Sequence, residues 1–261
     1  MRQIVNDILI LKPFNAVFFG CLFLTILAGI YFIKKNIGKT TAEKKKAVAV
    51  LYSVTFVIFI IYKILLSMDS EYSEICVLNG LSEFNWLVEL PLNLCNINII
   101  LIVIGVLTGS ESVLGFCFFF GSLGATLATV MPCIGFSGYS ILLPRMLGFY
   151  VCHLAVILEM PILLCLGLYK PSYRNIPKAF LTLVSIATVM TAFNLVMRAT
   201  GLAPGCNYFY TADPTGIPPL ELLYSWIPIP GVYMLPLYLC GLLPFMYLVT
   251  FLCKRKERQT N

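Results

Sequence analysis

The sequence predicts an all-α membrane protein, a polytopic transmembrane helical bundle of about seven helices. Of its 261 residues, 59% are hydrophobic and only 11% are charged, whereas about a quarter of the residues of a soluble domain are charged. The mean hydropathy of +0.91 is also far above the soluble range. Several segments reach the roughly 20 apolar residues that a helix needs to cross the hydrocarbon core. We therefore expect a single integral membrane domain over residues 1–261 that passes through the bilayer several times.

Seven hydrophobic segments are long enough to be spans. The first is too long for a signal peptide and no small-residue cleavage site follows it, so we interpret it as a retained helix. The predicted spans cover residues 14–33, 47–66, 88–107, 113–131, 146–168, 178–198 and 231–253.

Lysine and arginine residues gather in three places that seven helices would put on one side of the membrane. By the positive-inside rule this side is cytoplasmic, so the N-terminus is expected outside and the C-terminus inside. Basic clusters that flank spans determine topology and meet anionic lipid, and we expect no nucleic-acid partner. The clusters are Lys34, Lys35, Lys39, Lys44, Lys45 and Lys46, then Lys170, Arg174 and Lys178, and finally Lys254, Arg255, Lys256 and Arg258.

The third predicted span is unusually polar. It contains Glu89, Asn93, Cys95, Asn96 and Asn98 within an otherwise apolar run. Hydrocarbon offers no hydrogen bonds, so these side chains must face protein or a cavity. On a helix they would cover an arc of roughly 220°. The span is therefore expected at the centre of the bundle.

Cys95 and His153 are the candidate catalytic residues. Each lies about seven residues, or roughly 10 Å, below the predicted outer surface, and His153 is the only histidine in the chain. A thiol in apolar surroundings is inert unless a neighbouring base generates the thiolate. An imidazole can take that proton and return it to a leaving group near neutral pH.

Other polar residues of this region are candidates for binding substrate or for donating hydrogen bonds to an oxyanion, a contribution that is large where water is excluded. They are Asn93, Asn96, Asn98, Asn207 and Tyr208.

The residues also leave plainer roles open. A cysteine on a membrane helix is commonly a small apolar filler, and a histidine within a span can be a hydrogen-bond partner between helices. Cys152 is a rival nucleophile, but adjacent side chains on a helix point about 100° apart.

Three further ionisable residues lie in the predicted spans. Lys63 is expected either to extend toward the interface or to pair with Glu89, and Glu159 needs a partner or a proton. Arg198 is expected to be an interfacial anchor, with phosphate binding as the alternative.

The outer loop at residues 201–216 is rich in proline and glycine and is expected to be neither helix nor continuous strand. Its aromatic residues suit a cap over a cavity entrance, and an aromatic belt without a specific role is the alternative. Cys76, Cys133 and Cys206 fall in predicted outer loops, so one disulfide among them is open if the outside is oxidising.

The motif Leu-Pro-Leu-Asn-Leu-Cys at residues 90–95, the lone His153, and the Asn207–Tyr208 pair followed by Pro214 resemble the YwaF-like family of multi-pass membrane proteins. The resemblance extends from about residue 45 to 253. It implies transfer of acyl chains between phospholipids, with Cys95 carrying the acyl group as a thioester and His153 assisting. Asn93 departs from the family, in which many bacterial members have His or Gln at that position.

We therefore predict a lipid acyltransferase that acts on membrane phospholipids and needs no cofactor or metal. The alternative is a small-solute transporter or channel with a polar pathway along the third span. The inner halves of the third and fifth spans, residues 99–107 and 161–168, are almost wholly apolar, which favours a cavity open to one side only. A structural or sensor protein that binds lipid without turnover is the third hypothesis.

Overall fold

The structure is a computed structural model, and it describes residues 9–78, 84–214 and 216–260. It is an all-α bundle with six helical segments that are long and apolar enough to cross a membrane, together with one shorter apolar helix. The protein is thus an integral multi-pass membrane protein, as the composition predicts.

All seven predicted spans correspond to helical segments. They are α2 (Ala16–Asn36), α3 (Thr41–Ser67), α5 (Leu94–Thr108), a fourth segment of α6 (Glu111–Phe116), η1 (Cys117–Gly121) and α7 (Ser122–Val130), a fifth of α8 (Pro144–Ile157) and α9 (Glu159–Cys165), then α10 (Ile176–Ala199), and a seventh of η4 (Val232–Met234), η5 (Leu237–Leu242) and α12 (Leu243–Thr260). Turns of π-helix interrupt the fourth and seventh segments at η1 and η5.

The third span is shorter than the prediction of 88–107, because α5 begins only at Leu94. Pro91 has no backbone N–H and disfavours helical geometry in the residue before it, so the preceding segment forms turns instead. Glu89 and Asn93 therefore precede the helix, and Cys95 lies in its first turn. The prediction that Glu89 and Asn93 lie on the same helix as Cys95 is therefore wrong.

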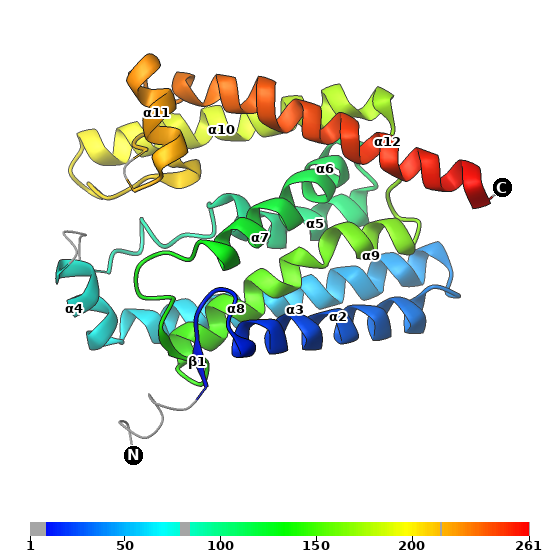
Figure 1. Ribbon diagram of the computed structural model, residues 1–261, viewed down its shortest axis with the longest axis horizontal. Helices are drawn as coiled ribbons and strands as arrows, with labels where there is room; N and C mark the ends of the chain where they lie inside the picture. Colours follow the sequence, from blue (N-terminus) through cyan, green and yellow to red (C-terminus); the bar gives the residue numbers. More distant parts are fainter. Residues whose placement is uncertain (1–8, 79–83, 215, 261) are drawn as a thin grey trace.

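The centre of the bundle is formed by α5 and the fourth segment. Figure 1 shows them between α10 and α12 on one side and α2, α3, α8 and α9 on the other. Helix α3 packs against both α5 and α8. Gly148 allows the close approach of α8 to α3, because a Cβ atom at this position would overlap the side chain of Tyr62. These contacts bring the first turn of α5 next to the middle of α8.

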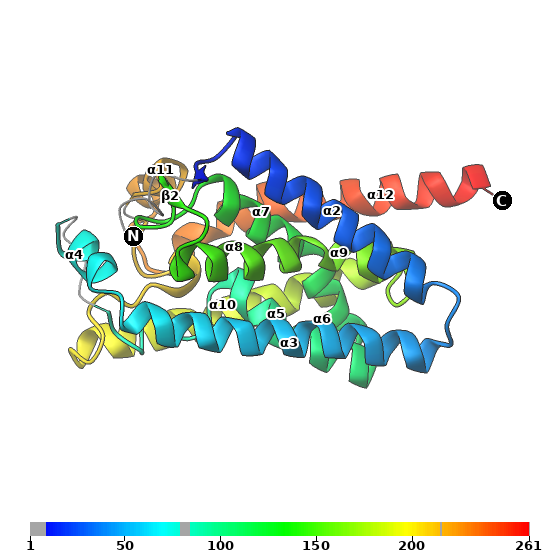
Figure 2. The same cartoon turned by 90° about the horizontal axis from the view of Figure 1, so that it is seen from below.

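The two ends of the bundle differ in structure. At one end, the cap end, lie the short paired strands β1 (Ile10–Leu11) and β2 (Tyr139–Ser140) and the helices α4 (Ser70–Leu78) and α11 (Pro218–Trp226). At the other, the basic end, lie the turn between α2 and α3 and the C-terminal end of α12 (Figures 1 and 2). The described chain thus begins and ends at opposite ends, as an odd number of passes requires. Which end faces the cytoplasm stays a prediction.

The sequence did not predict the strands or the helices of the cap end. The loop at 201–216 is non-helical as expected, apart from the 3-10 turn η3 (Tyr208–Tyr210). Cys76, Cys133 and Cys206 carry free thiols in this structure.

Candidate active site

Cys95 and His153 meet between α5 and α8. The distance from His153 Nε2 to Cys95 Sγ is 3.1 Å, which is hydrogen-bonding distance for a thiol and an imidazole. His153 is buried, and Cys95 is half-buried in the first turn of α5. Two residues 58 positions apart, on different helices, therefore make the contact that a nucleophile and its general base require.

The hydrogen bond of His153 Nδ1 determines whether Nε2 can accept the thiol proton. Nδ1 lies 2.7 Å from the carbonyl oxygen of Phe149, one helical turn earlier. A carbonyl oxygen only accepts hydrogen bonds, so Nδ1 carries the hydrogen and the lone pair of Nε2 faces the Cys95 thiol. The neutral ring is therefore in the tautomer that a general base requires.

Aromatic packing fixes the orientation of the imidazole. The Phe149 ring lies 4.1 Å from the His153 ring, centroid to centroid, and Phe136 stacks on Phe149 at 4.6 Å. These rings restrict rotation of the histidine and exclude water from one side of the pair, which strengthens electrostatic interactions there.

A buried ion pair lies close to the thiol. Lys63 of α3 pairs with Glu89, one of the two outcomes predicted for it, and only 6% of Lys63 is exposed. The Lys63 ammonium lies 4.8 Å from the centroid of the Tyr62 ring. Its charge also acts on both Cys95 and His153. The ion pair therefore belongs to the electrostatic surroundings of the thiol and the imidazole.

The three asparagines of this region occupy different environments. The Asn96 side-chain oxygen lies 3.7 Å from Cys95 Sγ, whereas Asn93 caps the start of α5 without a side-chain hydrogen bond to the helix. The amide nitrogen of Asn98 donates to the carbonyl oxygen of Leu94 at 2.5 Å. Their proposed contact with an oxyanion stays a prediction.

Tyr208 links the outer loop to the segment before Cys95. Its hydroxyl donates to the Leu87 carbonyl at 2.8 Å and accepts from the Leu90 amide at 3.0 Å. Asn207 instead closes its own loop, because its side chain bonds the backbone of Ala212 and Asp213. The loop therefore lies against residues 87–90, while a contact of either side chain with substrate stays a prediction.

Two residues of the loop at 201–216 have a strained backbone, and hydrogen bonds hold it in place. Phe209 and Tyr210 both have left-handed φ angles, 57° and 54°, which cost free energy for residues other than glycine. The Tyr233 hydroxyl donates to the Tyr210 carbonyl, and Tyr210 Oη lies 3.9 Å from Cys133 Sγ. Arg198 bonds Asp213 and the Pro204 carbonyl, and its role as an interfacial anchor stays a prediction.

The rival nucleophile Cys152 points elsewhere. Its sulfur lies 3.9 Å from the Thr55 carbonyl of α3, and it is buried between these helices. As the helical geometry predicts, it faces away from the ring of its neighbour His153.

A second polar cluster lies deeper in the bundle. Both of its residues, Glu159 and Asn98, are polar positions of the predicted spans, but the sequence did not predict that they meet. Glu159 is fully buried, and neither carboxylate oxygen has a hydrogen-bond partner among the described residues. The side-chain oxygen of Asn98 also has none there. Both groups face Gly121 at the end of η1. The π-helical turn η1 has no signal in the sequence, so the meeting of these two groups at Gly121 could not be predicted.

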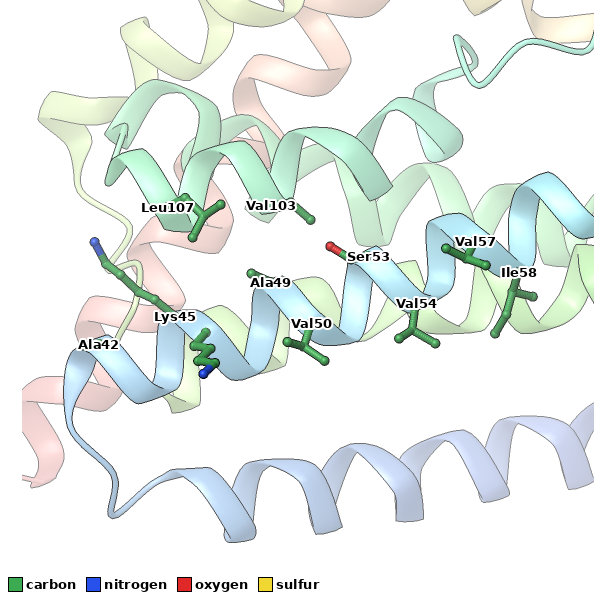
Figure 3. A pocket seen from close by; sticks show the side chains of 11 residues that line it. Ala42, Lys45, Ala49, Val50, Ser53, Val54, Val57, Ile58, Val103 and Leu107 are labelled. Atoms are coloured by element: carbon green, nitrogen blue, oxygen red, sulfur yellow. The ribbon is translucent and has the colours of Figure 1, made fainter.

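One cavity lies away from this pair. It is a groove of about 620 Å³ along the outside of α3 and α5 toward the basic end, and Figure 3 shows its apolar lining. We assign the candidate active site by the contact of the reactive groups instead, since a lipid substrate can reach a membrane site from the side.

Comparisons with known proteins identify one relationship. A scan against protein-family models matches residues 7–230 to the TMEM164 family. Searches of curated proteins and of solved structures found no match.

Proposed function

This chain belongs to the TMEM164 family, and we propose that it is a membrane-embedded lipid acyltransferase that uses Cys95 and His153. The observation that carries the proposal is the 3.1 Å contact between the only imidazole of the chain and a thiol. The resemblance to the YwaF-like family, which stays a prediction, supplies the chemistry of acyl transfer between phospholipids.

The first half-reaction forms a thioester. His153 Nε2 takes the Cys95 proton, and the thiolate attacks the carbonyl carbon of an acyl ester in a phospholipid. A carbon–sulfur bond forms, the ester carbon–oxygen bond breaks, and His153 returns the proton to the departing oxygen. A lysophospholipid leaves, and the acyl chain remains on Cys95.

The second half-reaction reverses these steps with another lipid. The hydroxyl of a lysophospholipid or ether lysolipid gives its proton to His153 Nε2 and attacks the thioester carbonyl. The carbon–sulfur bond breaks and the thiolate regains the proton. Neither half-reaction uses water, and water would hydrolyse the thioester. A site that excludes water therefore favours acyl transfer over hydrolysis.

Two features of the site support this cycle. The Phe149 carbonyl keeps the imidazole neutral at Nε2 before each proton transfer. The stacked rings of Phe136 and Phe149 exclude water from one side of the thiol–imidazole pair. Asn96 contacts Cys95 through its side-chain oxygen, which accepts a hydrogen bond. Its proposed role at the oxyanion therefore requires its amide nitrogen to turn toward the sulfur.

The first prediction tests the nucleophile. A phospholipid with a clickable acyl chain should label the purified protein in liposomes, and hydroxylamine should remove the label because a thioester is cleaved by it. Cys95→Ala should abolish labelling, and His153→Ala should slow it by roughly 10²–10⁴-fold. The measurement is labelled protein per folded protein against time.

Cys152→Ala is the matched control, since its sulfur is on the same helix but faces Thr55. It should be labelled like the wild type. Equal labelling of the Cys95→Ala variant contradicts the proposal. Solute uptake into liposomes that survives Cys95→Ser would instead favour the transporter hypothesis.

A further inference from the structure

The groove on α3 and α5 is an asymmetric surface with an apolar body and a charged end. Val50, Val54 and Val57 of α3 and Leu107 of α5 line its body, and Lys45 and Lys46 lie at its basic end. Figure 3 shows Val103 and Leu107 on α5 facing the α3 residues across the groove. The groove is therefore complementary to an amphiphile that has one anionic end.

The two lysines of the groove have no ion-pair partner in the part of the chain that the structure describes. Lys63 and Lys178, by contrast, pair with Glu89 and Glu111. Lys45 Nζ lies near Gly109, the left-handed residue that ends α5, so the ammonium closes the groove at this end. Two adjacent unpaired cations at the border of an apolar groove favour an anionic group at that place.

The length of the groove matches one leaflet. From Lys46 to Ile58 the helix rises by roughly 18 Å, close to half of the roughly 30 Å hydrocarbon core. A partner transmembrane helix would need a contact surface across both leaflets. The acyl chain of a lipid needs only one, with its phosphate at the interface where the lysines lie.

We propose that this groove binds one anionic phospholipid from the leaflet at the basic end of the bundle. Its acyl chain lies along the valines of α3, and its phosphate lies between Lys45 and Lys46. The site is separate from the proposed acyl-transfer site, because Cys95 and Leu107 lie near opposite ends of α5, roughly 18 Å apart along the helix axis. The inference stands whether or not the protein transfers acyl chains.

The test uses the full chain purified in mild detergent, with lipid retention measured by native mass spectrometry. Phosphatidylglycerol titrated into the wild type should give one retained lipid, in preference to zwitterionic phosphatidylcholine. The double variant Lys45→Gln/Lys46→Gln should lower this retention by about tenfold or more. The control Lys34→Gln/Lys35→Gln removes the same charge from the same end of the bundle, outside the groove, and should leave retention unchanged.

Two further measurements distinguish lipid binding in the groove from general attraction of anions to the lysines. Inorganic phosphate at millimolar concentration should not displace the lipid, because it cannot use the apolar body of the groove. Val54→Trp fills the groove without a charge change and should reduce retention, whereas Val189→Trp on the exposed face of α10 should not.

Size-exclusion profiles and thermal unfolding show that each variant is folded before its lipids are counted. Equal losses in the two lysine double variants, equal retention of both lipids, or displacement by free phosphate would each overturn the inference.

Discussion

At the scale of single residues, Glu159 is the side chain whose environment is most costly. A charged carboxylate without a partner is strongly disfavoured in an apolar interior, and Glu159 is fully buried. Its carboxyl group and the Asn98 side-chain oxygen both face Gly121, and both lack hydrogen-bond partners among the described residues. A proton on Glu159 would remove the buried charge and would offer a donor to the Asn98 oxygen. We infer that Glu159 is protonated and donates to Asn98.

This inference gives the second prediction. Glu159→Gln keeps a neutral donor of nearly the same shape and should stay close to the wild type in thermal stability. Glu159→Leu leaves the Asn98 oxygen buried without a donor and should cost about 1–3 kcal/mol. Thermal unfolding in detergent measures both changes. A glutamine variant as unstable as the leucine variant would show that the carboxyl group is charged and has a different role.

The limits of sequence reasoning are clearest at these residues. The shared depth of Cys95 and His153 was visible in the hydropathy pattern, but which faces of the two helices meet depends on packing. The pair of Glu159 and Asn98 depends on η1, in which the hydrogen-bond spacing of the backbone changes. The phenylalanine-rich sequence at this turn gives no local signal for that change.

At the scale of elements, the contact between α3 and α8 determines whether His153 reaches Cys95. Gly148 lies five positions before His153, and a Cβ atom there would overlap Tyr62. Hydropathy alone locates the helices well, because a span must be long and apolar. It located the start of α5 wrongly, because Pro91 breaks the helix within an apolar run. The interhelical glycine contact has no counterpart in a hydropathy profile.

The third prediction follows from this contact. Gly148→Ala should force α8 away from α3 and lower the stability by about 1–3 kcal/mol. Because His153 moves with its helix, acyl labelling of Cys95 should also fall in the fraction that remains folded. Gly20→Ala is the control, since a Cβ atom at this helical glycine meets nothing within 4 Å. Unchanged labelling in a folded Gly148→Ala variant would contradict the importance of this contact.

At the scale of the whole molecule, the bundle has two chemically different ends. Turns, short strands and aromatic side chains form the cap end, and the basic residues between α2 and α3 lie at the other. Cys95 lies in the first turn of α5, toward the cap end. The leaflet from which a lipid reaches the thiol therefore depends on how the molecule is oriented, and lysine placement predicts that the cap end is outside.

The fourth prediction tests that orientation. Gly38→Cys places a thiol in the exposed turn at the basic end, and Gly201→Cys places one in the exposed loop at the cap end. Both are introduced into a chain whose exposed native thiols Cys133, Cys165 and Cys240 are replaced by serine. On intact cells, a membrane-impermeant maleimide should label Gly201→Cys and spare Gly38→Cys, whereas permeabilised cells should show both. The reverse pattern would put the basic end outside and would direct the proposed substrate to Cys95 from the cytoplasmic leaflet.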